Sequence, residues 1–151
     1  MQTFLPFESY SESARVLDVK RLGSQRNEAY LALKTIINSK KFPNQKFPWQ
    51  NHIICRIWNG YELQLFDYLQ RICYEWHDIR GHKDTVLDKA KKELLPWCCV
   101  NCKDGIKPYF LGNDEFHSSH RASLLYKNYE HYKQFGWAEK PQINYVWPKN
   151  S

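Results

Sequence analysis

The chain has 151 residues, a formal net charge of +6 at pH 7 and a pI near 9.0. Its length predicts one domain spanning residues 1–151, and its positive charge favours an anionic partner, with nucleic acid ahead of an anionic membrane surface. No stretch approaches the ~20 apolar residues of a membrane-spanning helix, and no signal peptide is recognisable. We therefore expect a cytoplasmic, intracellular protein with no membrane partner.

The first predicted helix is short and follows an extended segment. Residues 1–8 contain Pro6, which blocks an early helix. Ser9 or Ser11 can then cap a helix that runs through Leu17, because a serine hydroxyl accepts a hydrogen bond from a backbone N–H of the first turn.

A long helix is predicted from Leu22 to Asn38, and we expect it to fray over residues 39–41. At about 100° per residue, one side of this helix is apolar and contains Leu22, Ala29, Leu33, Ile36 and Ile37. The opposite side contains Arg21, Gln25, Glu28 and Thr35. Arg26 falls inside the apolar sector, where a charge needs a partner or an open cleft. Glu28 is thus expected to project beside cations from a rigid element, although a solvated helix face gives the same pattern.

The loop over residues 42–50 contains two prolines and mixes cations with aromatic side chains. The residues concerned are Phe42, Lys46, Phe47 and Trp49 in the loop, with Lys40 and Lys41 directly before it. Such a mixture suits a nucleic-acid backbone with stacked bases. A solvated loop that is held in place by its aromatic side chains is an equally good explanation.

The next two helices are predicted to lie on either side of Gly60. Asn51 can cap a short helix over residues 52–58. The second helix, Tyr61–His77, carries one apolar stripe of Leu65, Leu69, Ile72, Cys73 and Trp76. We expect it to be the central core helix, with Leu65, Leu69 and Trp76 inside.

The remainder of the chain predicts shorter helices and irregular segments. Asp84 or Thr85 caps a helix that ends near Leu94. Residues 97–114 are expected to be irregular, and a helix is predicted over residues 120–127, which residues 128–132 can extend. Since no stretch reads as a strand, the predicted class is all-α, a compact single-domain helical bundle with long irregular loops.

One ordered set of motifs resembles a known family. The order Leu17-Asp18-x-Lys20-Arg21-Leu22-Gly23-x-Gln25-Arg26-x-Glu28-Ala29 resembles the N-terminal segment of the pyrimidine-dimer DNA glycosylases, which include the phage-type endonuclease that nicks at ultraviolet photoproducts. The chain is most similar to a bacterial and viral branch of small proteins, whose shared motifs are here Met1 to Pro6, Asn51-His52, Trp58-x-Gly60-Tyr61, Arg80-Gly81-x-Lys83-Asp84-Thr85, Phe116-His117-x-x-His120-Arg121-x-Ser123-Leu124-Leu125 and Tyr145 to Pro148.

The resemblance implies a DNA repair glycosylase that attacks the sugar with an amine. An α-amino group titrates near pH 8, against about 10.4 for lysine, so a chain terminus is partly neutral without tuning. Glu28 matches the essential glutamate of the family by its place in the motif, and Arg21 and Arg26 would hold phosphates beside it.

The N-terminus departs from the phage pattern, in which removal of the initiator methionine exposes a threonine. Gln2 is bulky, so we expect Met1 to be retained and its amine to be reactive, with the amine of Gln2 as the alternative if Met1 is removed. Lys20 is a substitute that needs a strongly depressed pKa. If the terminal amine reacts, residues 1–5 must fold back over the long helix, so that the amine lies beside Glu28.

The predicted DNA contacts extend along the chain. They are Arg15, Lys20, Arg21, Gln25, Arg26, His52, His117, His120 and Arg121, and we expect the arginines among them and Lys20 to converge on one cleft. His52 resembles a family position near the active cleft, but it can equally be a helix-start histidine that its own backbone satisfies. His117 and His120 are three residues apart and could share a helix face, yet no carboxylate at helical spacing completes a metal site.

The three cysteines Cys98, Cys99 and Cys102 lack the fourth ligand that a structural zinc site needs. We expect reduced thiols, no metal and no cofactor. The leading hypothesis is a monomeric DNA glycosylase with AP-lyase activity, which acts on double-stranded DNA containing pyrimidine dimers or another altered base. The alternatives are a non-catalytic nucleic-acid-binding protein on the same scaffold and a scaffold with a different glycosidic substrate.

Overall fold

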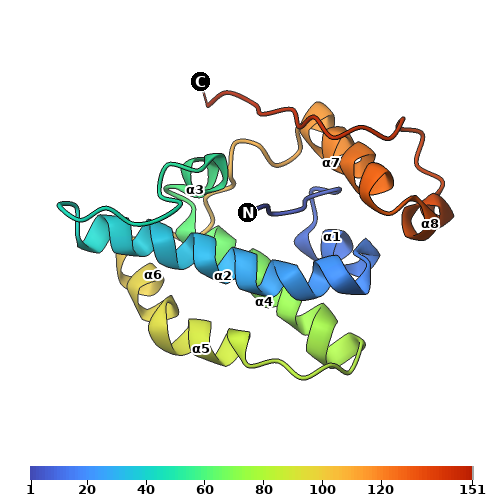
Figure 1. Cartoon of the computed structure of the whole chain (residues 1–151). Coiled ribbons are helices and arrows are strands. Elements are labelled where there is room, and N and C mark those ends of the chain that lie inside the picture. Colours follow the sequence, from blue (N-terminus) through green and yellow to red (C-terminus); the bar gives the residue numbers. More distant parts are fainter. Residues whose placement is uncertain (151) are drawn as a thin grey trace.

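Helices account for all the regular secondary structure within residues 1–150, which the computed structural model describes (Figure 1). In chain order they are α1 (Tyr10–Val16), α2 (Val19–Lys41), α3 (Ile53–Trp58), α4 (Glu62–Tyr74), the π-helical turn η1 (Glu75–Ile79), α5 (Val86–Glu93), α6 (Leu95–Asn101), α7 (Asp114–Lys127), α8 (Tyr129–Tyr132) and the 3-10 turn η2 (Lys133–Phe135). The prediction of an all-α fold is confirmed.

The long helix α2 and the central helix α4 form the middle of the molecule, where they pack against each other more extensively than any other pair (Figure 1). The predicted apolar stripe of α4 is confirmed, since Leu65, Leu69, Ile72 and Cys73 are all buried. None of the helices within residues 1–150 combines the length and the apolar character needed to cross a bilayer.

The N-terminal segment is part of this core. It enters between α2 and α7 (Figure 1), and Thr3, Phe4 and Leu5 are buried. The backbone N–H of Phe4 donates to the side chain of Gln25 on α2 at 3.0 Å. The prediction that residues 1–5 fold back over the long helix is therefore confirmed.

The predicted outer side of α2 was partly wrong, because Gln25 and Thr35 are buried. Helix α2 contacts α3 and α5 as well as α4, and the N-terminal segment covers a further part of it. A single apolar stripe underestimates the buried surface of a helix with neighbours on several sides.

Several boundaries also differ from those predicted, and α2 runs from Val19 to Lys41 without fraying over residues 39–41. The cap of α3 is His52 rather than Asn51, since the His52 side chain accepts from the N–H of Ile54. Part of the segment expected to be irregular is α6, which has a proline in its first turn, where the missing N–H costs nothing. Helix α7 begins at Asp114 instead of His120, because the Asn113 side chain caps it.

Arg26 has the partner that its apolar surroundings require. Its guanidinium lies 2.7 Å from the carboxylate of Asp84 and 4.3 Å from the centroid of the Trp76 ring. The Trp76 ring also stacks on the ring of His82, with the centroids 4.2 Å apart. A Cβ at Gly23 would lie 3.0 Å from Trp76, so glycine lets α2 approach this stack. Trp76 is only half-buried, which corrects the prediction that it lies inside; the turn η1 carries it past the end of α4.

Candidate active site

A groove of about 370 Å³ brings the N-terminus together with the start of α2. Its lining residues are Met1, Gln2, Phe4, Lys20, Arg21, Ser24, Glu28, Lys127 and Tyr145. The sequence had singled out Met1, Gln2, Lys20, Arg21 and Glu28 for this site. Lys127 and Tyr145 were missed as groove residues, since they are about 100 residues from α2, although Tyr145 belongs to one of the resembling motifs.

The amine of Met1 lies 3.7 Å from Oε1 of Glu28, so the expected proximity of the two groups is confirmed. The Met1 side chain is only 2% exposed, and its sulfur lies 4.0 Å from the Sγ of Cys55 on α3. The carboxylate side chain is 31% exposed. The amine is therefore fixed by its own buried side chain, while the carboxylate beside it remains open to the groove.

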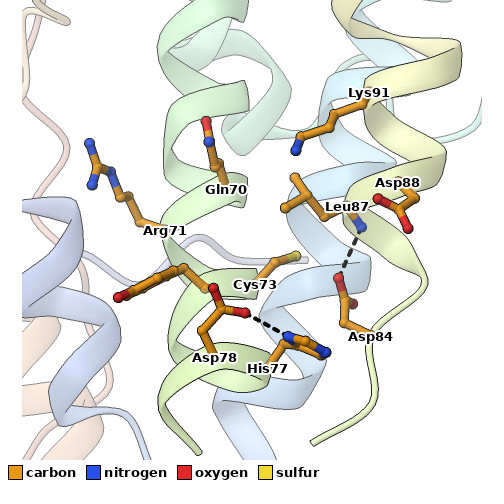
Figure 2. A pocket seen from close by; sticks show the side chains of 10 residues that line it. Gln70, Arg71, Cys73, His77, Asp78, Asp84, Leu87, Asp88 and Lys91 are labelled. Carbon is orange, nitrogen blue, oxygen red and sulfur yellow. Dashed lines mark hydrogen bonds and ion pairs between the residues drawn. The ribbon is translucent and has the colours of Figure 1, made fainter. Parts of the chain in front are cut away.

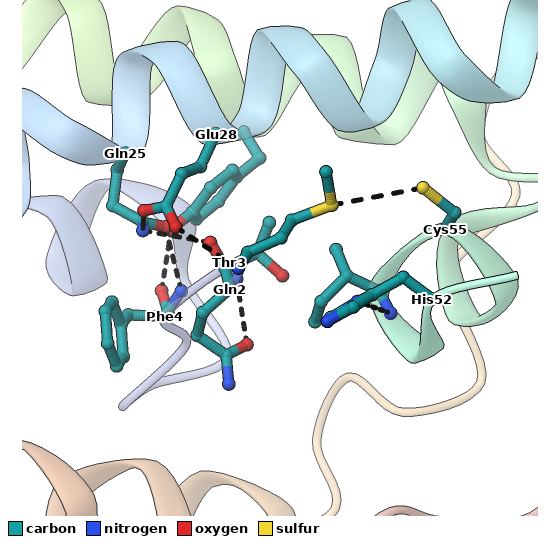
Figure 3. A network of polar contacts seen from close by, with 10 residues as sticks. Gln2, Thr3, Phe4, Gln25, Glu28, His52 and Cys55 are labelled. Atoms are coloured by element: carbon teal, nitrogen blue, oxygen red, sulfur yellow. Dashed lines mark hydrogen bonds and ion pairs between the residues drawn. The ribbon is translucent and has the colours of Figure 1, made fainter. Parts of the chain in front are cut away.

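Gln25 positions both the N-terminal segment and the carboxylate of Glu28 (Figure 3). Its Nε2 donates to Oε2 of Glu28 and to the backbone oxygen of Gln2, both at 2.9 Å. Its Oε1 accepts from the N–H of Phe4 and, at 2.7 Å, from the hydroxyl of Tyr68. Because Gln25 is completely buried, its predicted contact with DNA is corrected: the side chain holds the site together from below.

Tyr68 supports this network from α4. Its hydroxyl lies 2.7 Å from Oε1 of Gln25 and 2.9 Å from the backbone oxygen of Phe4. Burial, followed by the charge of Glu28, raises the pKa of Tyr68 well above its usual value. The hydroxyl therefore keeps its proton and remains a donor at neutral pH.

We expect Gln25→Leu to destabilise the fold by about 2–4 kcal/mol, because several buried polar groups would lose their partner at once. The exposed Gln134 provides the control, Gln134→Leu, which should unfold at the same urea concentration as the wild type within error. Urea unfolding followed by circular dichroism measures both. An unchanged midpoint for Gln25→Leu would show that the network contributes nothing to the fold.

His117 and His120 hold the same N-terminal segment from the opposite side. The N–H of Leu5 donates to Nδ1 of His120 at 2.9 Å, and Nδ1 of His117 lies 2.8 Å from the oxygen of Leu5. Since Nε2 of His117 accepts from the N–H of Gly112, its proton is on Nδ1 and is donated to Leu5. The prediction that the two histidines share a helix face is confirmed.

Both histidines are buried, which corrects their predicted role in contacting DNA. Burial lowers the pKa of His117 and lowers that of His120 to about 3, so both rings are neutral at physiological pH. Their Nδ1 atoms are occupied by Leu5. Within residues 1–150, no three His, Cys, Asp or Glu side chains are grouped so that they could hold a metal ion.

The predicted basic residues do not all converge. Lys20 and Arg21 line the groove, where Arg21 also pairs with Asp18 at 3.4 Å. Arg26 instead faces Asp84. Arg15 lines a different hollow with residues of α4 and η1.

Arg121 also lies outside the groove. Its guanidinium lies 2.9 Å from Glu139 and donates to the backbone oxygen of Pro6 at 2.6 Å, beside a separate cavity of about 660 Å³ at α7. The predicted convergence of five cations is therefore wrong: only Lys20 and Arg21 of that set line the groove, and Lys127 joins them.

The helix-start role, one of the two alternatives for His52, is confirmed. Its Nδ1 accepts from the N–H of Ile54 at 3.1 Å, as expected for a histidine that caps a helix. Burial lowers its pKa, and the positive charge of the nearby N-terminal amine adds to this effect. His52 thus contributes a neutral ring on the side of the N-terminal segment away from Glu28 (Figure 3).

A second cavity of about 370 Å³ lies between α4, η1 and α5 and also contains an amine and carboxylates (Figure 2). Lys91, Asp84 and Asp88 line it. The carboxylate of Asp84, however, already accepts from Arg26 and from the N–H groups of Val86 and Leu87. Asp84 therefore has a structural role as a helix cap and ion-pair partner.

The three cysteines Cys98, Cys99 and Cys102 do not line the groove. Cys98 is buried, Cys99 is exposed and Cys102 is half-buried. Burial raises the pKa of the Cys98 thiol to about 12 and raises that of Cys102 as well. Both thiols are thus protonated at neutral pH.

The family described as pyrimidine dimer DNA glycosylase has a model that matches residues 1–90. The matched stretch includes the amine, Glu28, its hydrogen-bond partner Gln25, and Tyr68, which donates to Gln25. Helix α7 and the C-terminal segment lie outside it. No curated protein and no solved structure matches the chain.

Proposed function

Because this chain belongs to the pyrimidine dimer DNA glycosylase family, a family of DNA repair enzymes, we propose that it combines base excision with AP-lyase activity. The proposed substrate is duplex DNA that contains a pyrimidine dimer or another altered base. The amine of Met1 is the proposed nucleophile and Glu28 the proposed carboxylate catalyst. The observation that carries this proposal is the 3.7 Å separation of these two groups in a groove rimmed by cations.

The first step exchanges one bond for another at the sugar. The neutral amine attacks C1′ of the altered nucleotide, and the glycosidic C1′–N bond breaks as the new C1′–N bond forms. The base leaves with the electron pair of the old bond and takes up a proton. Ring opening then protonates O4′ and gives an imine between C1′ and the amine.

The second step breaks the strand. Removal of a proton from C2′ of the imine allows its electrons to expel the 3′-phosphate, which cleaves the C3′–O3′ bond by β-elimination. Water then adds to the imine and releases the amine. Throughout, the proposed role of Glu28 is to stabilise positive charge at C1′ and to accept and return protons.

The remaining groove residues suit DNA binding and orientation. Lys20, Arg21 and Lys127 line the groove and can contact backbone phosphates, which position a duplex without reading its sequence. Gln25 keeps Glu28 and the N-terminal segment in place before DNA arrives, and such preorganisation matters because a misplacement of about 1 Å can cost a hundredfold in rate.

A nicking assay tests this function. We expect the purified protein to nick ultraviolet-irradiated plasmid, to spare untreated plasmid, and to become covalently attached to DNA when borohydride reduces the imine. Nicking of irradiated plasmid without attachment would indicate strand cleavage that does not pass through an imine. Salt-sensitive duplex binding with neither nicking nor attachment would support the non-catalytic binding protein instead.

A further inference from the structure

Trp49 is the most unusual residue of the loop between α2 and α3. Its φ of 72° makes it the one non-glycine residue within residues 1–150 with a positive φ. This left-handed conformation is unfavourable for a residue with a bulky side chain, because the Cβ approaches the following carbonyl oxygen. Trp49 is nevertheless 52% exposed, so the strained backbone does not serve to bury its ring fully.

The strained conformation is held by the surrounding loop. The N–H of His52 donates to the backbone oxygen of Trp49 at 2.9 Å. Just before it, the N–H of Phe47 donates to the side chain of Gln50 at 2.8 Å, and the N–H of Gln50 returns to the oxygen of Phe47 at 3.3 Å. The loop thus presents an exposed indole from a fixed backbone, an arrangement typical of functional rather than structural strain.

His52 connects this indole to the candidate active site. The rings of Trp49 and His52 meet edge to face, with centroids 5.8 Å apart. His52 caps α3, the helix against which the Met1 side chain packs through Cys55. Trp49 therefore packs against His52, a ring close enough to the N-terminal amine for the charge of that amine to lower its pKa. Figure 3 shows His52 across the N-terminal segment from Glu28.

The charge of the loop matches a nucleic-acid strand. Lys41 and Lys46 are exposed, and neither forms an ion pair with any side chain of residues 1–150. Lys40, by contrast, is paired with Glu62. An exposed aromatic face with unpaired cations beside it is the combination with which proteins bind unstacked bases and their phosphates.

Resting on the proposed function, we propose that Trp49 is a stacking platform for an unpaired nucleobase that the protein exposes beside the sugar it attacks. The ligand class is a nucleobase of the substrate duplex, and any base can serve because each has an aromatic face. The strain at Trp49 is then the cost of holding the platform ready in the free protein.

The test compares two duplexes that differ only at one position: one carries an uncleavable tetrahydrofuran analogue of an abasic site, and the other is fully paired. Fluorescence anisotropy measures the binding of each. We expect Trp49→Gly to weaken binding of the tetrahydrofuran duplex by about tenfold to a hundredfold, and of the paired duplex by less than about threefold. Trp49→Phe should recover part of the loss. Tyr129→Ala removes a comparably exposed aromatic ring, 54% exposed on α8, and should bind both duplexes like the wild type.

A thermal melt separates this role from a structural one. Glycine adopts a positive φ without penalty, so Trp49→Gly should unfold at the wild-type temperature or above it. A lower melting temperature together with an equal loss for both duplexes would overturn the inference, as would unchanged binding of the tetrahydrofuran duplex. If the wild type binds neither duplex, the proposed function fails and this inference fails with it.

Discussion

Glu28→Gln is expected to lower the rate of strand cleavage by about a thousandfold or more while leaving DNA binding intact or tighter. Glutamine keeps the shape of the side chain and can still accept from Nε2 of Gln25 through its amide oxygen. It carries no negative charge and cannot accept a proton at neutral pH. Loss of one preorganised electrostatic or acid–base group typically costs about a hundredfold to ten-thousandfold, and here one carboxylate would lose both roles.

Gel analysis of a duplex with a single pyrimidine dimer measures the cleavage rate. Glu130→Gln is the matched control, since Glu130 is 82% exposed on α8 and pairs with Lys133. It should cleave at the wild-type rate. Cleavage by Glu28→Gln within about tenfold of the wild type would remove Glu28 from the chemistry.

A Gly-Ser extension ahead of Met1 is expected to abolish borohydride trapping. It converts the amine of Met1 into an amide, which has no nucleophilic lone pair, and it moves the nearest α-amino group away by about 3.8 Å per added residue. The new amine would also lack the anchor that the buried Met1 side chain provides. As a result of both effects, no α-amine lies beside the Glu28 carboxylate.

The same two residues appended after Ser151 provide the control, because they alter neither the amine nor Glu28. Duplex binding should be similar for both extended proteins and the wild type. If the N-terminally extended protein is trapped as efficiently as the wild type, the nucleophile is another amine, and Lys20→Arg on that background decides whether it is Lys20.

Much of this arrangement could be predicted because it depends on local sequence. The apolar stripe of α4 follows from helical periodicity alone. The approach of the N-terminus to Glu28 followed from the family resemblance together with a chemical requirement, namely that the amine and the carboxylate must serve the same sugar carbon. Neither step needed knowledge of contacts between distant parts of the chain.

The positions that were wrongly predicted depend on such distant contacts. Gln25 looked outward by periodicity, but a segment 21 residues earlier covers it. His120 and His117 are engaged by Leu5, more than 110 residues away. A helix pattern reveals which face can be buried, but the partner that buries a polar residue is visible only in three dimensions. Gln25, His117 and His120 were therefore predicted to contact DNA, whereas their side chains hold the N-terminal segment in place.

The most direct test of this account is to locate the DNA adduct in the wild-type protein. The protein is incubated with a dimer-containing duplex and borohydride, digested, and the cross-linked peptide is sequenced by mass spectrometry. We predict that the modified nitrogen is the α-amine of Met1, 3.7 Å from the Glu28 carboxylate in the free protein. An adduct on Lys20 or another lysine, or no adduct on a substrate that the protein cleaves, would contradict it.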